Sequence, residues 1–449
     1  MRPKDNHTFL TTAPVGKVIL TMAVPTVISM LVTSMYNMVD TFFVGRISTQ
    51  ATAAVGLVFP VMTVIQAFGF FFGQGSGTYI SRMLGARNRE DASCMAVSSL
   101  VCSIVFGMVL AALGLIFLDP LSRGLGASDS LLQPTKDFLG IILIGAPFFN
   151  GSLTLNNQIR FQGNAAYSMF GILSGALLNV IAVPLFIFAF GMGVKGAALG
   201  TVIGQITGFF VLLAMSFKGD GVKLKLKDFS FEWKYYSELF KGGTPSLTRQ
   251  GMASIATLLL NVSAGAFGDA AIAGMSIVSR ISLMVFSFIL GLGQGFQPVC
   301  GFSYGAGLYD RVKKGYFFCL QLGTCVLLAC CIPGFIFSDT IVDIMRHDPE
   351  VVAVGMSALR WQVLTWPLAA FITFSNMTLQ TSARTIPANI LAACRNGIFF
   401  IPLIIILPHF FGLLGVEMCQ SICDFLSFLV GLVLMVRYFR SLPPHNLSR

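Results

Sequence analysis

The sequence predicts an all-α integral membrane protein with twelve transmembrane helices in two pseudo-symmetric six-helix bundles. The first observation is composition: the chain is 55% hydrophobic and 11% charged, whereas a soluble domain averages about 25% charged residues. The second is that apolar runs occur about twelve times, each long enough to cross ~30 Å of hydrocarbon as a helix. The third is that the two halves of the chain resemble each other.

The resemblance between the halves is clearest at glycine and proline positions. Pro25 corresponds to Pro245, and the run Gly73–Gly75 corresponds to Gly293–Gly295, in each case 220 positions later. Transporters are often built from such repeats, with the substrate handled at their interface. Six spans per half is an even number, so both halves enter the membrane in the same direction. The two-fold axis is therefore predicted to run along the membrane normal.

The expected elements follow the apolar runs in order. A first bundle, 1–217, is predicted to contain spans at 18–43, 52–76, 93–118, 138–158, 165–190 and 194–216. A charged linker, 218–241, separates it from the second bundle. That bundle, 242–449, is predicted to contain spans at 242–265, 270–297, 315–337, 354–379, 386–408 and 413–436. Charged loops end the second span of each half, at 81–91 and at 303–314.

The net charge of +10 is explained by membrane topology. With the N-terminus inside, the inner loops and tails hold about 20 of the 29 Lys and Arg residues, which is a strong positive-inside pattern. We therefore expect a multi-pass protein of the cell (inner, cytoplasmic) membrane with both termini cytoplasmic. The expected surroundings are the lipid bilayer, and no nucleic acid is expected as a partner.

No motif points to an enzyme or a cofactor. The ten cysteines include many inside apolar runs and form no CxxC pattern. The four histidines lie in tails or near span ends, and no GxxxxGK[ST] phosphate loop occurs. We expect no catalytic residue, no cofactor and no certain metal site.

Charged residues within the spans are the functional candidates, because a charge inside a bilayer is costly. Asp40 shares a helix face with Tyr36 and Asn37, which lie four and three residues earlier. A carboxylate beside an amide and a phenol can hold Na⁺ or accept a proton. The alternative is that Asp40 reaches the outer interface or caps a neighbouring helix.

The other acids within the spans are Glu417 and Asp424, and the span arginines are Arg249, Arg280, Arg360 and Arg395. Asp424, Arg280 and Arg395 are expected at comparable depth. Two interpretations stay open for them: a pair that only neutralises buried charge, or a part in substrate binding and charge relay. Glu417 is expected at the membrane interface.

Several segments resemble the multidrug and toxic compound extrusion (MATE) family, and in particular its MepA-like branch. The resemblance covers essentially the whole chain, from about residue 15 to 436, and the order of the segments together with the twelve-span repeat makes it specific. The segments are Asn37–Arg46, Ala53–Gly56, Phe59–Pro60, Gly85–Asn88, Arg160–Asn164, Gly293–Pro298, Tyr304–Gly307 and Arg395–Pro402. The resemblance implies two bundles that open alternately to either side of the membrane.

The resemblance also implies a cation-coupling set, formed here by Asp40, Asn179 and Thr201. Val183 stands where the family pattern expects a second carboxylate, and the seventh span contains no acid. Losing a carboxylate weakens a Na⁺ site, at Asp40 and Asn179 for example, whereas a proton needs one titratable group. The sequence therefore favours H⁺ over Na⁺ as coupling ion.

The predicted function is secondary active, cation-coupled antiport of amphipathic and often cationic drugs, by a monomer. One alternative is a flippase for lipid-linked precursors in the same superfamily, which would favour a strongly cationic cavity. The other is a non-transporting receptor or scaffold that has lost its coupling site.

Overall fold

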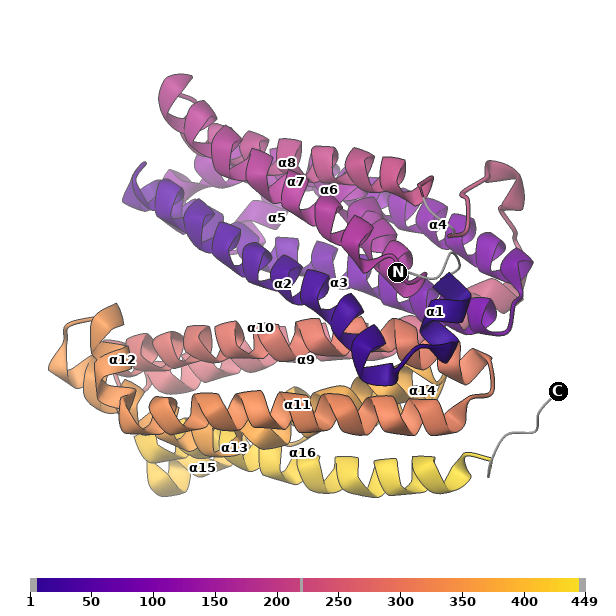
Figure 1. Cartoon of the computed structure of the whole chain (residues 1–449). Coiled ribbons are helices and arrows are strands. Elements are labelled where there is room, and N and C mark those ends of the chain that lie inside the picture. The colour runs from indigo at the N-terminus through magenta and orange to yellow at the C-terminus, as the bar shows by residue number, and fades with distance from the viewer. Residues whose placement is uncertain (1–5, 219–220, 444–449) are drawn as a thin grey trace.

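The computed structural model describes residues 6–218 and 221–443, except the side chains of residues 36–41 and 49. Within them the chain is almost entirely helical and forms two bundles (Figure 1). The first bundle contains α1 Asn6–Thr12, α2 Val15–Gly45, α3 Thr49–Gly85, α4 Arg89–Ile116, α5 Leu118–Gly124, α6 Asp129–Phe161, α7 Ala165–Pro184 with the π-helical turn η1 Leu185–Ala189, and α8 Gly193–Ser216.

A connecting segment with the short 3₁₀ turn η2, Leu226–Asp228, leads into the second bundle. That bundle contains α9 Trp233–Gly265, α10 Asp269–Gly305, α11 Tyr309–Ile336, α12 Ser338–Met345, α13 Pro349–Thr381, α14 Thr385–Ala393, the π-helical turn η3 Cys394–Ile398, α15 Phe400–Phe411 and α16 Leu413–Ser441. The helix α9 begins at Trp233, inside the segment 218–241 predicted as linker.

The repeat seen in the sequence extends to the helix boundaries. Helices α3, α4 and α6 correspond to α10, α11 and α13, and both their first and their last residues lie 220 positions apart. Even side-chain contacts repeat: Asn156 donates to the carbonyl of Ser168 at 3.0 Å, and Asn376 donates to that of Ala388 at 2.7 Å. The predicted class, two pseudo-symmetric bundles of membrane helices, is confirmed.

Among the described residues, 10 helices are long and apolar enough to cross a membrane. The long helices α9 and α13, predicted as the seventh and tenth spans, do not reach that threshold. Both carry polar residues along their length, and in α9 these residues form a stripe that is described below. The short helices α1, α5 and α12 were not predicted.

The two ends of the molecule differ in how the bundles meet. We call the end that holds α1, the connection from α8 to α9 and the last turn of α16 the linker end, and the opposite end, which holds α5 and α12, the far end (Figure 1). At the linker end α2 lies against α10. Toward the far end the two helices diverge (Figure 1).

The linker end is closed by a seam of glycines that face backbone of the other bundle. A Cβ placed on Gly85 would lie 2.3 Å from the carbonyl oxygen of Phe302, and one on Gly305 would lie 1.9 Å from that of Arg82. These two contacts are equivalent by the internal repeat, because Gly85 corresponds to Gly305 and Arg82 corresponds to Phe302 at the offset of 220. The seam therefore contains the two-fold axis, and only glycine lets the backbones approach so closely there.

Candidate functional site

The helix α10 carries one continuous face from the seam into the diverging region. A Cβ on Gly295 would lie 2.4 Å from the Cα of Ala23 in α2, and Ser287 lies 3.2 Å from Ser34 of α2 between hydroxyl oxygens. Steps of three and four residues continue this face to Met284 and Arg280. Met284 is 63% exposed and Arg280 is exposed. This face is thus covered by α2 at the linker end and uncovered toward the far end.

The helix α9 continues in the same way from its seam residue Gly243, which lies against Gly75 and Phe71 of α3. Residues on the same face nearer the far end are Ser254, Thr257 and Asn261, and all three are exposed. Uncharged polar side chains on an exposed stripe of a membrane helix indicate contact with water rather than lipid. Together with Met284 and Arg280, they give the region between the diverging bundles an amphipathic lining.

Inside the first bundle, Asn179 of α7 and Thr201 of α8 lie on neighbouring, closely packed helices. Asn179 is 3% exposed, and a Cβ on Gly204 would lie 3.0 Å from its Cβ. Thr201 is buried and donates to the carbonyl of Ala197 at 3.0 Å. Thr201 lies one turn of α8 before Gly204. It and Asn179 therefore lie in the same part of the contact between α7 and α8.

Val183 lies one turn beyond Asn179 and packs into the contact between α7 and α8. A Cβ on Gly200 would lie 2.6 Å from a methyl carbon of Val183, which is almost fully buried. The side chains of Tyr36, Asn37 and Asp40 lie outside the described residues. The backbone of this part of α2 is helical.

Asp424 of α16 and Arg395 of η3 form an ion pair in the second bundle. Arg395 Nε donates to one carboxylate oxygen at 2.7 Å, and a terminal nitrogen donates to the other at 3.3 Å. Gln420 also donates to Asp424 at 2.9 Å, and the guanidinium lies 4.9 Å from the ring centre of Phe286. The Asp424 side chain is 2% exposed and that of Arg395 is 23% exposed, so the structure joins two of the predicted residues in a largely buried cluster.

The remaining charged span residues are not part of this cluster. Arg280 makes no ion pair with any described residue. Arg249 donates to Asn376 at 2.9 Å, and Arg360 donates to Ser338 at 2.9 Å. Glu417 is buried and accepts a short hydrogen bond from Ser357. Among the described residues, no cluster of three or more His, Cys, Asp or Glu residues is able to hold a metal ion.

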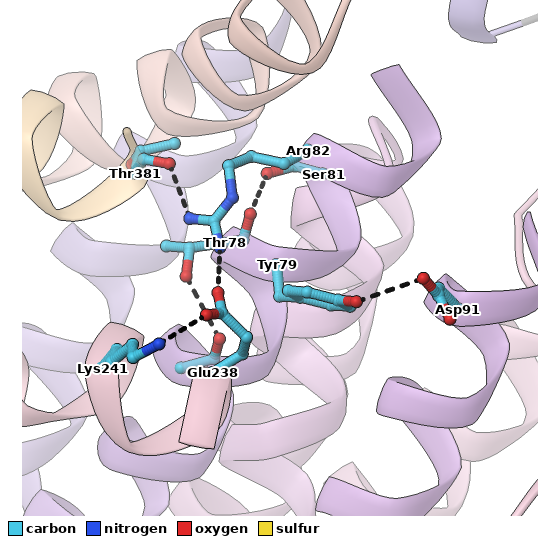
Figure 2. A network of polar contacts seen from close by, with 9 residues as sticks. Thr78, Tyr79, Ser81, Arg82, Asp91, Glu238, Lys241 and Thr381 are labelled. Carbon is cyan, nitrogen blue, oxygen red and sulfur yellow. Dashed lines mark hydrogen bonds and ion pairs between the residues drawn. The ribbon is translucent and has the colours of Figure 1, made fainter. Parts of the chain in front are cut away.

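Closure of the linker end includes one polar clasp, formed by Arg82, Glu238 and Thr381. Arg82 of α3 donates to the backbone carbonyl of Thr381 in α13 at 3.0 Å and to Glu238 of α9 at 3.0 Å (Figure 2). Lys241 also pairs with Glu238 at 3.1 Å. One nearly buried guanidinium, 8% exposed, thus ties the first bundle to two helices of the second.

Asp91, at the start of α4, anchors the first turn of α9 beside this clasp. It accepts hydrogen bonds from Lys234 at 2.7 Å and from Tyr235 at 2.8 Å. It also accepts one from Tyr79 at 3.4 Å (Figure 2). The hydrogen bond to Asp91 raises the pKa of Lys234 above its ordinary value. The start of α9 is therefore fastened to the first bundle although most of α9 belongs to the second.

The sequence suggests a buried pair of Asp424 with an arginine, but not the clasp, nor Gln420 and Phe286 as neighbours of that pair. Arg82 lies in the basic loop segment 81–91, whose charge by itself indicates only the inner side of the membrane. Gln420 lies four residues before Asp424, so the helix spacing alone could have suggested that they interact. Nothing in the sequence indicates Phe286 as a neighbour of Arg395, because the two are far apart in the chain.

Comparison with known families gives one model match over most of the chain. The MatE family model matches residues 25–185 and 245–406, which is one segment in each bundle. Multidrug export protein MepA of Staphylococcus haemolyticus (strain JCSC1435) is 28% identical over 438 residues, covering 95% of this chain and 96% of that protein. The MepA protein of Staphylococcus aureus (strain MRSA252) is 28% identical over 434 residues, covering 95% of each.

Solved transporter structures share the whole architecture. A transporter of the MOP superfamily from Pyrococcus furiosus, described as having a binding pocket of reverse polarity, superposes with a TM-score of 0.92 at 25% identity and covers 99% of this chain and 100% of its own. An outward-facing multidrug resistance MATE family transporter of the MOP superfamily gives a TM-score of 0.91 at 26% identity, with coverage of 99% and 100%.

Proposed function

Since the chain belongs to the MatE family, we propose that it is a secondary active multidrug exporter that exchanges amphipathic, often cationic molecules for entering H⁺ by alternating access. The protein is assigned to the cell membrane, with the linker end and both termini on the cytoplasmic side. The diverging far end then faces outward. The protein acts as a monomer, because each chain contains both bundles and the region between them.

The observation that carries this proposal is the amphipathic lining between the diverging bundles. On α10 the lining combines the flexible apolar Met284 with the charged Arg280, and on α9 it offers hydroxyl and amide groups. Methionine adapts to ligands of different shape. Amphipathic molecules match such a surface, because it provides apolar contact and a few hydrogen bonds in one place.

Asp40 is proposed as the coupling group, with Asn179 and Thr201 beside it. The helices α2 and α10 run antiparallel, and their contacts Ala23–Gly295 and Val27–Gly291 fix their register. Continued toward the far end, this register places residue 38 of α2 level with Arg280, two residues from Asp40. Asp424 is held by Arg395 and Gln420, and Glu417 lies in the second bundle beside Ser357. We therefore assign coupling to Asp40, the acid level with the region between the bundles. Protonation of Asp40 from outside would then compete with a bound cationic substrate.

The single carboxylate supports H⁺ over Na⁺. Na⁺ takes several oxygen ligands, and Val183 supplies none. Val183 also packs against backbone of α8, which leaves no space for a ligand at that position. A proton needs only one group whose charge can be removed.

The arginines support export of drugs over flipping of lipid-linked precursors. A flippase for pyrophosphate-linked lipids would concentrate positive charge in the cavity. Three of the four span arginines, Arg249, Arg360 and Arg395, instead bond to partners within the second bundle. Arg280 alone of these four lies on the face that α10 exposes.

Uptake of a fluorescent organic cation into inside-out vesicles tests the function. Accumulation driven by a proton gradient, and not by a sodium gradient of equal size, is expected. Accumulation driven only by sodium would overturn the choice of ion. Gradient-driven movement of a labelled lipid, with none of the dye, would favour the flippase, and movement of neither would favour a receptor or scaffold.

A further inference from the structure

We propose that the segment connecting the two bundles is a binding surface for anionic phospholipid headgroups of the inner leaflet. We call residues 222–233 the linker strap. The proposal concerns a site apart from the region between the bundles and does not depend on the coupling ion.

The linker strap exposes large apolar side chains outside the predicted spans. Leu226 is 82% exposed, Phe231 is 84% exposed and Trp233 is 75% exposed. Three exposed lysines, Lys223, Lys225 and Lys227, alternate with the strap's aliphatic residues; they are named together here as the strap lysines. None of the strap lysines forms an ion pair among the described residues. Apolar side chains beside unpaired lysines are the composition expected of a segment that lies in a membrane interface.

Hydrogen bonds hold the linker strap along the first bundle. The backbone N–H of Val222 donates to Gln162 at 2.7 Å, and Ser93 of α4 donates to Asp228 at 2.6 Å. The backbone N–H of Ser230 donates to Ser98 of α4 at 3.0 Å. The linker strap therefore has a fixed position beside α4 (Figure 1).

The depth of that position follows from the length of α4. Its 28 residues make a helix about 42 Å long, which exceeds the hydrocarbon core by ~12 Å. The charged residues of α4, Arg89 to Asp91, are all at the linker end, so the excess length projects there. Ser98 lies nine positions after Arg89, about 14 Å along the helix, and hence near the hydrocarbon boundary. Phe231 and Trp233 follow Ser230 by one and three residues. We therefore place them near the same boundary, where aromatic residues are enriched in membrane proteins.

Charge selects the kind of lipid. Asp228 is hydrogen-bonded to Ser93, and Lys234 is paired with Asp91. The strap lysines therefore outnumber the one exposed acid of the segment, Glu232. A basic segment at the inner surface attracts anionic headgroups within about a Debye length. A protein partner would not require the aromatic residues to lie level with the lipid boundary, and we therefore favour lipid.

Fluorescence of Trp233 tests the proposal. The full-length protein is reconstituted in vesicles of phosphatidylcholine and phosphatidylglycerol in equal amounts, with the acyl chains of one or the other lipid brominated. The Trp233 signal is the difference between wild type and Trp233→Phe. We expect stronger quenching of Trp233 when phosphatidylglycerol carries the bromine, and loss of this preference in high salt.

Two triple variants separate the linker strap from general surface charge. Replacing all strap lysines, Lys223→Gln, Lys225→Gln and Lys227→Gln, should equalise quenching by the two lipids. The control Lys17→Gln, Lys314→Gln and Arg440→Gln removes the same charge from exposed positions at the same end and should retain the preference. Absence of quenching by either lipid, equal quenching in wild type, or a preference that survives in the strap variant would each overturn the proposal.

Discussion

At the scale of single residues, Asp40 and Asp424, two of the three span carboxylates, have different expected roles. Asp424 accepts three hydrogen bonds from Arg395 and Gln420, so a fixed positive charge already balances it. Asp40 belongs to the bundle whose predicted spans contain no other acid. A carboxylate that is neutralised by a fixed arginine has little reason to exchange protons during transport, and we therefore assign the coupling to the single acid of the first bundle.

Replacing Asp40 by Asn is expected to abolish gradient-driven export while leaving the protein folded. The amide keeps the shape of the side chain and removes its titration. Dye efflux under a proton gradient measures the effect, and size-exclusion behaviour checks folding. Export at the wild-type rate by a well-folded Asp40→Asn variant would move the coupling site elsewhere.

Replacing Asp424 by Asn is expected to act on stability instead. Arg395 would be left as an uncompensated charge in the second bundle, and breaking a buried pair costs about 3–5 kcal/mol. A thermal unfolding transition in detergent should shift downward. Transport per folded molecule should stay close to wild type, and a selective loss of coupled transport with unchanged stability would instead make the pair part of the relay.

At the scale of helices, the glycine seam limits the size of the side chains that α3 and α10 can have where the two bundles meet. Replacing Gly85 or Gly305 by Ala is expected to weaken closure of the linker end, because each new Cβ meets a backbone carbonyl of the other bundle. Overpacking of this kind typically costs about 1–3 kcal/mol. Labelling of a cysteine placed at the linker end by a water-soluble thiol reagent should become faster, in a background without the native cysteines.

The matched control for this substitution is Gly56→Ala, also in α3. A Cβ on Gly56 meets nothing within 4 Å, so labelling should not change. The two seam variants should behave alike, since Gly85 and Gly305 are equivalent by the repeat. A large effect of one and none of the other would show that the seam is not symmetric in function.

The fold was predictable from the sequence because membrane-spanning helices require long apolar runs. The repeat also places each apolar run and its glycines and prolines in both halves of the chain. The seventh span, α9, is less apolar than the other spans because of its polar stripe, Ser254, Thr257 and Asn261. The same stripe faces the region between the bundles. The short helices α1, α5 and α12 escaped prediction, since they are too short to leave a period. Which arginine pairs with Asp424, and which groups Arg82 contacts, could not be predicted, because pairing between helices depends on packing that no single segment encodes.

At the scale of the whole molecule, opening the linker end requires Arg82 to leave Thr381. Glu238→Gln removes the charge that holds Arg82 in place and leaves a nearly buried guanidinium without a counter-ion. We expect the conformation closed at the linker end to lose population, seen as a shorter distance between spin labels across the far end. Glu232→Gln, an exposed acid six residues earlier, should leave the distance distribution unchanged. A Glu238→Gln distribution identical to wild type would show that the clasp does not control closure.

The paired glycine contacts also carry information about ancestry. Gly85 meets Phe302 just as Gly305 meets Arg82, which is the pattern of an isologous homodimer interface. Such an interface is what the duplication and fusion of a gene for a six-helix dimer would leave behind. Fusion freed the copies to diverge: Arg82 and Glu238 correspond to Phe302 and Val18, so the polar clasp exists on one side only. A homodimeric ancestor would have carried two such clasps or none, and the single chain became able to fasten its two halves unequally.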